Sequence, residues 1–225
     1  MATTGKWLVS ILMTAGIVAA FTYAPVATRP NFSTGVMEPW PAFRIFFFHV
    51  PAAWVAVLAF AVAMIYSIRF LRNRDRRLDD VAMASSQLGF LFCFLALVSG
   101  MIWARWEWGA FWSWDPRQNT VLVLLLIYAG YFTLRSAVPD PVRRSRLAAV
   151  YSVAAFVTVP FLMFVVPRIM ESLHPSPIIK SGEGSGVMDA KMRQVFFVLL
   201  ASFTGLYVWM LSLRARVERA SRRGI

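Results

Sequence analysis

Long apolar runs, separated by short polar segments, dominate this chain. Six such runs can be drawn, at residues 7–24, 43–68, 83–103, 120–134, 147–166 and 195–213. Several of them exceed the roughly 18 apolar residues that indicate a membrane-spanning helix. The pattern predicts an all-α integral membrane protein, a six-transmembrane-helix bundle that forms a single domain over residues 1–225. A signal peptide is the alternative for the first run, but its only charge is Lys6 and no clean A-x-A site follows, so we expect a retained helix.

Composition supports a membrane protein and argues against a nucleic-acid partner. The 225 residues are 59% hydrophobic and only 15% charged, whereas a soluble domain is about half apolar and a quarter charged. The net charge of +12 would suit nucleic acid. The arginines, however, cluster beside the ends of the apolar runs, which is typical of membrane topology. We therefore expect contact with membrane lipid and no nucleic-acid binding.

The basic residues are divided unequally between the two predicted membrane faces. One face carries Lys6 and the arginines of two turns and of the C-terminal tail: Arg69, Arg72, Arg74, Arg76, Arg77, Arg135, Arg143, Arg144, Arg146, Arg214, Arg216, Arg219, Arg222 and Arg223. The basic-rich face of a membrane protein is usually cytoplasmic, so both termini are predicted inside. Three connections are then outside: residues 25–42, a tryptophan-rich loop at 103–119, and 167–194, which contains a flexible Gly/Ser tract at 180–186.

The tryptophan-rich loop reads W-A-R-W-E-W-G-A-F-W-S-W-D-P-R-Q-N. It holds five of the nine tryptophans, namely Trp103, Trp106, Trp108, Trp112 and Trp114. A few interfacial tryptophans would be ordinary anchors, but this density predicts a rigid apolar platform for a large, planar, aromatic ligand. Trp108 and Trp112 are four apart and would share a helical face. For any single indole, packing on its neighbours or anchoring in lipid is the alternative.

The only two histidines, His49 and His174, are both predicted on the outer face. An ionisable residue at membrane depth, such as His49, is a functional candidate. Its alternative role is to satisfy the carbonyl that Pro51 leaves without a partner near Phe47, or to cap another group near the membrane interface. Two imidazoles from opposite sides would make an axial pair for haem iron. Zinc is disfavoured because it needs three or four ligands, which Glu107, Asp115 or Glu171 would have to complete.

One acid and two arginines near the loop admit more than one role. Asp115 begins a helix well, with Pro116 in the first turn and Gln118 at the capping-box position, so a cap competes with direct ligand contact. Arg44 and Arg117 lie at outer helix ends. Each either extends to lipid headgroups or binds a carboxylate, such as a haem propionate, in a charge-assisted pair. The single cysteine, Cys93, is expected to be a buried, inert thiol.

Two motifs carry a family resemblance. The segment W-G-A-F-W-S-W-D-P-R-Q resembles the tryptophan-rich "WWD" signature of the haem-handling proteins of cytochrome c maturation. The segment F-F-F-H-V-P-A-A-W resembles the second-helix motif of the CcmC family within that group. Length, six spans and one outer histidine on each side of the signature agree with it, over nearly the whole chain. The CcmF and CcsA/ResC types share the signature but normally have longer chains with more spans.

The resemblance implies a function beyond what the residue pattern gives. It implies that His49 and His174 are the axial ligands of haem b, that the tryptophan-rich loop binds the porphyrin edge and docks the haem chaperone CcmE, and that Arg44, Trp103, Trp108, Asp115 and Arg117 matter for function. It also implies a bacterial inner-membrane protein that works with the ATP-binding subunit CcmA and the membrane subunits CcmB and CcmD. The chemistry expected of this chain is binding and transfer rather than catalysis. The chain has no phosphate-binding glycine motif, so ATP hydrolysis is expected in the partner.

Two other functions stay open at this point. One is a cofactor-free permease subunit of an ABC exporter, in which the aromatic loop is only a docking surface. The other is direct haem attachment to apocytochrome c, as in the larger relatives.

Overall fold

The computed structural model describes residues 3–31, 33–174 and 188–222, so the Gly/Ser tract at 180–186 lies outside the described residues. Within these described ranges, six helical spans are long and apolar enough to cross a membrane, and each predicted apolar run lies within, or largely within, one of them. The main helices are α1 (Thr3–Thr22), α2 (Phe46–Asn73), α3 (Arg76–Trp108), α4 (Pro116–Ala137), α5 (Pro141–Pro160) and α7 (Ala190–Arg222). Shorter elements are β1 (Ala27–Pro30), β2 (Met37–Trp40), the 3₁₀ turn η1 (Pro41–Ile45), the π-helical turn η2 (Phe161–Val165) and α6 (Val166–Ile169).

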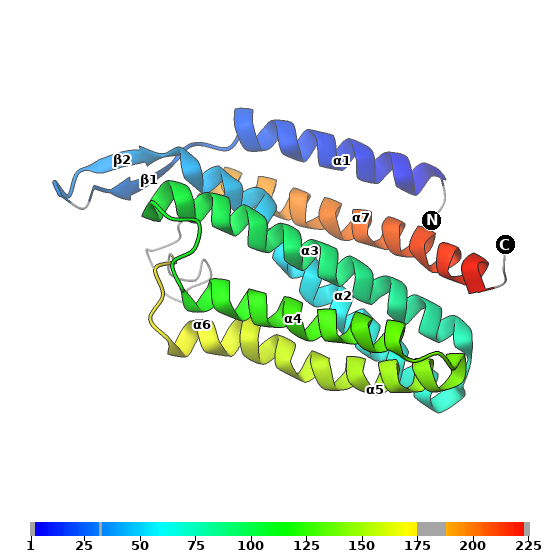
Figure 1. Cartoon of the computed structure of the whole chain (residues 1–225). Helices are drawn as coiled ribbons and strands as arrows, with labels where there is room; N and C mark the ends of the chain where they lie inside the picture. Colours follow the sequence, from blue (N-terminus) through cyan, green and yellow to red (C-terminus); the bar gives the residue numbers. More distant parts are fainter. Residues whose placement is uncertain (1–2, 32, 175–187, 223–225) are drawn as a thin grey trace.

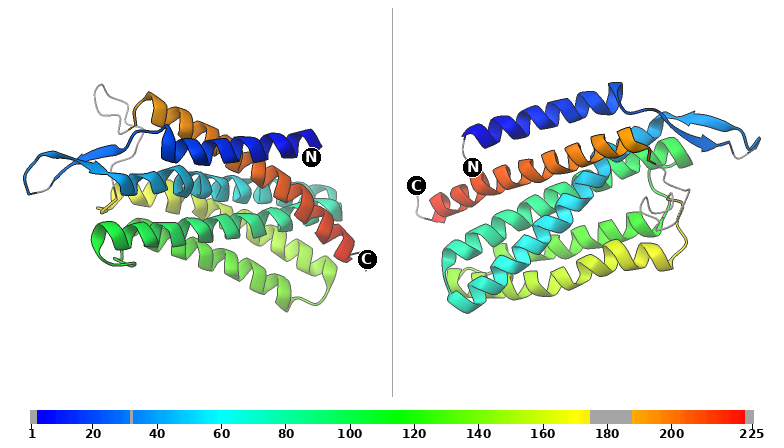
Figure 2. Two further views of the ribbon diagram at one scale, coloured as in Figure 1. Left: turned by 90° about the horizontal axis from the view of Figure 1, so that it is seen from above. Right: turned by 180° about the vertical axis from the view of Figure 1, so that it is seen from behind.

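The helices run side by side and divide the chain between two ends of one bundle. Both ends of the described chain lie at one end, together with the α2–α3 and α4–α5 turns, as Figures 1 and 2 show. We call this the arginine-rich end. The β1–β2 hairpin, the α3–α4 connection and α6 lie at the other end, the hairpin end (Figure 1). The connections therefore group as the charge pattern predicts. Which end faces the cytoplasm stays a prediction from that charge.

Helix α3 is longer than a membrane crossing requires. Its 33 residues span about 50 Å, against roughly 30 Å of bilayer hydrocarbon. Neither proline nor glycine interrupts W-A-R-W-E-W, and the helix ends only where Gly109 takes a left-handed conformation, with φ of 78°. The predicted loop at 103–119 is therefore wrong in its first part. Trp103, Trp106 and Trp108 are helical, and the connection proper covers residues 109–115.

The core lies where α2, α3, α4, α5 and α7 converge. The rings of Phe60 and Tyr128 stack there with centroids 3.6 Å apart. Cys93 belongs to the same cluster and is 1% exposed, which confirms the predicted buried thiol. Helix α1 packs along α7 at the edge of the bundle (Figure 2).

A two-stranded hairpin, absent from the all-α expectation, fills the connection between α1 and α2. Strands β1 and β2 pair antiparallel, with Ala27 opposite Trp40. Glu107, at the end of α3, anchors the hairpin because its carboxylate pairs with Arg29 and accepts a hydrogen bond from Trp40 Nε1 at 2.9 Å. The Glu107 side chain is only 4% exposed. A proline in each strand, tolerated at a sheet edge, hides the strands from sequence inspection.

Three helices are joined at the arginine-rich end by a buried ion pair. Arg135 of α4 donates two hydrogen bonds to Asp79 of α3, at 2.8 and 2.9 Å. Ser145 of α5 donates to the same carboxylate at 2.7 Å. A bidentate arginine–carboxylate pair is both strong and directional, so this cluster fixes how α4 and α5 pack on α3.

Candidate functional site

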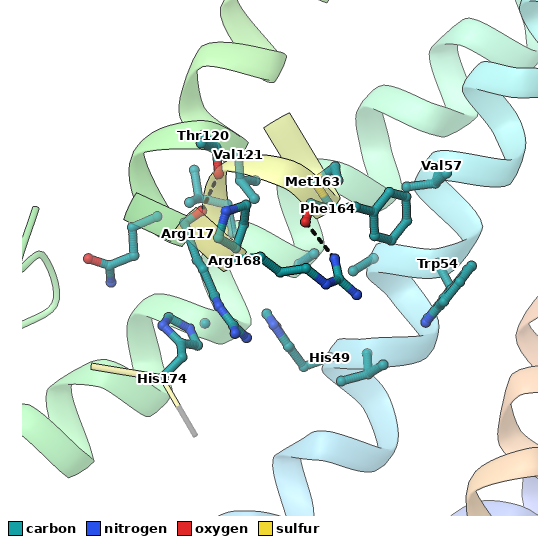
Figure 3. Close-up of a pocket in the computed structure, with 17 residues that line it drawn as sticks. His49, Trp54, Val57, Arg117, Thr120, Val121, Met163, Phe164, Arg168 and His174 are labelled. Carbon is teal, nitrogen blue, oxygen red and sulfur yellow. Dashed lines mark hydrogen bonds between the residues drawn. The ribbon is translucent and has the colours of Figure 1, made fainter. Parts of the chain in front are cut away.

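A cavity of about 260 Å³ lies at the hairpin end of the bundle. Residues of α2, α3, α4, η2 and α6 line it, together with His174 beyond α6 (Figure 3). The lining residues are His49, Val50, Ala53, Trp54, Val57, Ala96, Leu97, Gly100, Arg117, Gln118, Thr120, Val121, Met163, Phe164, Pro167, Arg168 and His174. Both histidines of the chain thus contribute to one site.

His49 is held by α3 rather than by its own helix. Its Nδ1 lies 3.0 Å from Ser99 Oγ, and Ser99 Oγ in turn lies 2.7 Å from the carbonyl of Leu95. The carbonyls of Leu95 and Ala96 both lie within hydrogen-bond distance of Ser99 Oγ and can only accept, so we assign the hydroxyl proton to them and the donor role at the histidine contact to His49 Nδ1–H. This tautomer leaves the lone pair of His49 on Nε2. The alternative role for His49, satisfying a carbonyl of its own helix, is not what the structure shows.

Close approach of α3 also fixes the position of the His49 ring. A Cβ atom built on Gly100 would lie 3.1 Å from His49 Cε1. Most side-chain contacts are looser than this, so the imidazole packs directly against the backbone of α3. Helix α3 therefore supplies both a hydrogen-bond partner and a flat surface for this ring.

His174 is held by Asp115 at the start of α4. Its Nδ1 lies 3.0 Å from Asp115 Oδ1, and a carboxylate only accepts, so Nδ1–H donates and Nε2 keeps the lone pair. Burial lowers the pKa of His174 to about 4 even though Asp115 opposes the shift, so the ring is neutral near pH 7. Metal-binding histidines commonly donate their second nitrogen to a carboxylate or another acceptor in this way.

Asp115 links the start of α4 to the segment that carries His174. It accepts a hydrogen bond from Arg117 N at 2.9 Å, which confirms the predicted cap. It also accepts from Leu173 N at 2.8 Å and from Ser172 Oγ at 2.9 Å. Burial alone would raise the pKa of Asp115, but these hydrogen bonds outweigh it and hold the pKa below its usual value. The carboxylate is therefore ionised at neutral pH.

Gln118 organises the α3–α4 connection, although not as a capping box. Its side-chain oxygen accepts from Ser113 N at 3.0 Å, and its side-chain nitrogen donates to the carbonyl of Phe111 at 3.1 Å. Gln118 is buried. It therefore fixes the residues before the cap instead of the Asp115 backbone itself.

The five tryptophans of the 103–119 stretch do not form one platform. Trp103 and Trp108 flank His174, with ring centroids 5.7 and 5.0 Å from the imidazole. Trp106 and Trp114 are 75% and 76% exposed, and Trp112 packs perpendicular to Trp114 at 5.9 Å. None of the five lines the cavity. Two indoles thus support His174, and the other three are directed elsewhere.

The two arginines predicted to bind carboxylates lie in different places. Arg117 lines the cavity, and its Nε is buried without a hydrogen-bond partner among the described residues. Arg44 instead donates to the carbonyl of Ala20 and lies near the Phe21 ring, outside the cavity lining. Sequence inspection missed Arg168, which lines the cavity beside Arg117. Its signal was an outer-face arginine close to His174, where basic residues are disfavoured.

The potential metal-ligating side chains of the site are divided between two imidazoles and acids that bind other partners. Among the described residues, no three His, Cys, Asp or Glu side chains gather as a metal-ion site would need. Of the acids that could complete a zinc site, Glu107 binds the hairpin and Asp115 binds His174. What remains is two imidazoles, both assigned the proton on Nδ1, in a cavity that also contains two arginines.

Comparison with known proteins gives a consistent result. The sequence matches the family described as Heme exporter protein C over residues 1–224. A Heme exporter protein C from Bradyrhizobium diazoefficiens is 34% identical over 80% of this chain and 68% of its own length. One from Rhodobacter capsulatus is 28% identical over 99% of this chain and 90% of its own length. A putative cytochrome c biosynthesis ccmC-like mitochondrial protein from Marchantia polymorpha is 30% identical, covering 73% of this chain and 70% of its own length.

Proposed function

Because the chain belongs to the Heme exporter protein C family, it is a haem-handling membrane protein of cytochrome c maturation, and we propose that it binds haem b between His49 and His174 and passes it to the chaperone CcmE. The site would face the periplasm from the bacterial inner membrane, since the arginine-rich end is predicted to be cytoplasmic. The observation that carries the proposal is the pair of imidazoles lining one cavity, each with Nδ1 3.0 Å from a partner on a neighbouring helix or helix cap.

The residues present fit the ligand. Haem supplies an iron with two axial positions, and neutral imidazole nitrogens are suitable axial ligands. The buried Nε of Arg117, unpartnered among the described residues, suits a haem propionate, for which the sequence also put forward Arg44. The cavity of about 260 Å³ is somewhat smaller than ordinary ligand pockets, which span roughly 300–1,000 Å³. Only part of a porphyrin would fit inside, which suits a cargo that must leave again.

The remaining candidate residues divide between two roles. Trp103 and Trp108 support the His174 ring, and Asp115 orients it. Trp106, Trp112 and Trp114 would form the surface on which the porphyrin edge and CcmE dock, since two of them are largely exposed. Partner subunits CcmA, CcmB and CcmD would complete the complex, and ATP hydrolysis by CcmA would drive release of haem to CcmE.

Haem titration with visible absorption spectroscopy tests the ligand assignment. The purified protein is expected to develop a low-spin spectrum with two nitrogen ligands. His49→Ala and His174→Ala should each weaken this low-spin spectrum, and the double variant should abolish it. Gln194→Ala is a suitable control. Gln194 lies near the start of α7, accepts a hydrogen bond from Tyr23 and does not line the cavity. An unchanged spectrum in the double variant would overturn the assignment.

Capture of partners tests the transfer step. Haem-loaded protein is expected to retain CcmE, and protein without haem or with both histidines replaced should retain less. Retention of apocytochrome c in place of CcmE would favour direct attachment. A cofactor-free permease subunit would be favoured if the protein bound no haem in the titration and kept its function after both histidines were replaced.

A further inference from the structure

Two arginines from different elements reach the histidine cavity. Arg117 comes from the first turn of α4 and Arg168 from the short helix α6, and both line the space that His49 and His174 share (Figure 3). Arg117 lies close enough to both imidazoles, and to Arg168, for its charge to act on them. Arg168 donates to the carbonyl of Phe164 in the preceding turn.

The π-helical turn before α6 accounts for the direction of Arg168. A π turn contains one residue more than an α turn, so residues after Phe161–Val165 are rotated by about 100° relative to an uninterrupted helix. Pro167 has no N–H to donate, but helical bonding continues past it, since Met170 N donates to the carbonyl of Val166 at 3.1 Å. The rotation places an arginine at the cavity where the apolar pattern of α5 would otherwise continue.

Charge in the cavity is unbalanced. Among the described residues that line it, none is Asp or Glu, whereas two carry guanidinium groups. Like charges in a partly apolar space repel, and burying a charge without a counter-ion is costly. Asp115 offsets part of the charge of Arg117, but its four acceptor contacts go to Arg117 N, Leu173 N, Ser172 Oγ and His174 Nδ1. An anionic ligand with two carboxylates would relieve the imbalance.

We propose that Arg117 and Arg168 together bind the two carboxylates of the haem, with Arg168 in the role that the sequence pattern gave to Arg44. The assignment rests on the proposed function, because it takes haem as the ligand. Arg44 and Arg168 each donate to a backbone carbonyl, but only Arg168 lines the cavity, and Arg44 does not. Paired guanidinium groups would select a porphyrin whose two acidic side chains are free.

The test is a thermodynamic cycle in which the carboxylates of the ligand and the arginines of the protein are removed separately and together. Haem and its dimethyl ester, which keeps iron and ring but lacks both carboxylates, are titrated into the wild-type protein, Arg168→Gln, Arg168→Lys, Arg44→Gln and Arg193→Gln. A hydrogen bond between charged groups changes affinity by about tenfold or more. Wild type should therefore prefer haem over the ester by that factor for each arginine. Arg168→Gln should lose about tenfold of this preference, and Arg168→Lys should recover part of it.

Arg193 is the matched control, since it is an exposed arginine near the start of α7, outside the cavity. Arg193→Gln should keep the wild-type preference. A low-spin spectrum of Arg168→Gln with the ester shows that the variant folds and still ligates iron. If Arg168→Gln keeps the full preference for haem, or if Arg44→Gln loses it instead, the assignment to Arg168 is wrong. If the wild-type protein never gives the low-spin spectrum, the proposed function itself fails, and this assignment fails with it.

Discussion

His174 Nδ1 lies 3.0 Å from Asp115 Oδ1, and the same carboxylate accepts the backbone N–H of Arg117 at the start of α4. One side chain thus serves as a helix cap and as the acceptor that orients an imidazole. A structural role and a role in ligand binding are normally hard to separate at such a residue. Here the chain offers a second capped helix that separates them.

Replacing Asp115 by Asn should lower haem affinity strongly and lower the stability of the fold only slightly. The amide keeps the size of the side chain but loses the charge that fixes His174, and loss of such an acceptor typically lowers metal affinity about 10–100-fold. Asp140 caps α5 in the same manner, accepting from Arg143 N at 2.6 Å, at the arginine-rich end. Asp140→Asn should therefore leave the haem titration unchanged. Equal haem affinity in the two variants would contradict the role of Asp115.

Ser99→Ala should act on His49 through the ring orientation. Without the hydroxyl, Nδ1 loses its acceptor, and the tautomer with the lone pair on Nε2 is no longer favoured. We expect haem affinity to fall by about tenfold and the low-spin absorption to broaden. Ser202 gives the matched control, because it is a buried serine that donates to the carbonyl of Val198. The prediction is wrong if Ser99→Ala and Ser202→Ala titrate alike.

Gly100→Ala should separate helix stability from haem binding. Alanine in a helix interior is more favourable than glycine by about 0.5–1 kcal/mol. This gain should offset much of the cost of displacing one side chain, so we expect a thermal midpoint close to that of the wild type. The new methyl group, however, would lie 3.1 Å from His49 Cε1 and would displace the ring. The measurement is a haem titration beside a melting curve. A variant with wild-type haem affinity would show that His49 tolerates the shift.

Glu107→Gln should release the hairpin from α3. The carboxylate binds both Arg29 and Trp40, and a hydrogen bond to a charged group contributes about 1.5–3 kcal/mol. Amide hydrogen exchange in β1 and β2 should therefore accelerate by about tenfold or more. Glu38 pairs with Arg29 in a more exposed position, so Glu38→Gln should accelerate exchange much less. Comparable rates in both variants would argue against Glu107 as the anchor.

Arg135→Ala should destabilise the bundle at its opposite end without touching the haem site. Removing one partner of a buried ion pair costs about 3–5 kcal/mol, because Asp79 would be left buried with its charge. A lower thermal midpoint in detergent is the expected result, with unchanged haem titration in the folded protein. Arg146 of the same end is exposed, so Arg146→Ala should melt close to wild type. A difference in haem affinity would show that the two ends communicate.

The sequence predicts the spans well because their signal is local. Each of the six apolar runs lies in or largely in one helix, and the sequence correctly places Cys93 in the core and Asp115 at a helix start. Helix ends are predicted less well, since hydropathy marks where lipid ends and not where a helix ends. This is why α3 extends to Trp108 and why the expected loop is only half irregular.

The contacts within the site are the part that sequence could not supply. Ser99 and Gly100 look like ordinary residues of an apolar run, and only the crossing of α2 and α3 brings them to His49. Arg168 depends on a π turn that no residue pattern announces. Arg44 has the charge expected of a ligand-binding arginine, but α1 packs close enough to take it up through the Ala20 carbonyl. Long-range packing decides each of these cases.

The division of the two imidazoles between helices has a mechanical consequence. His49 is hydrogen-bonded to Ser99 of α3, whereas His174 is hydrogen-bonded to Asp115, which caps α4. The distance between the two Nε2 atoms therefore depends on how α4 packs against α3. A small slide of one helix past the other would loosen the grip while every helix remained intact.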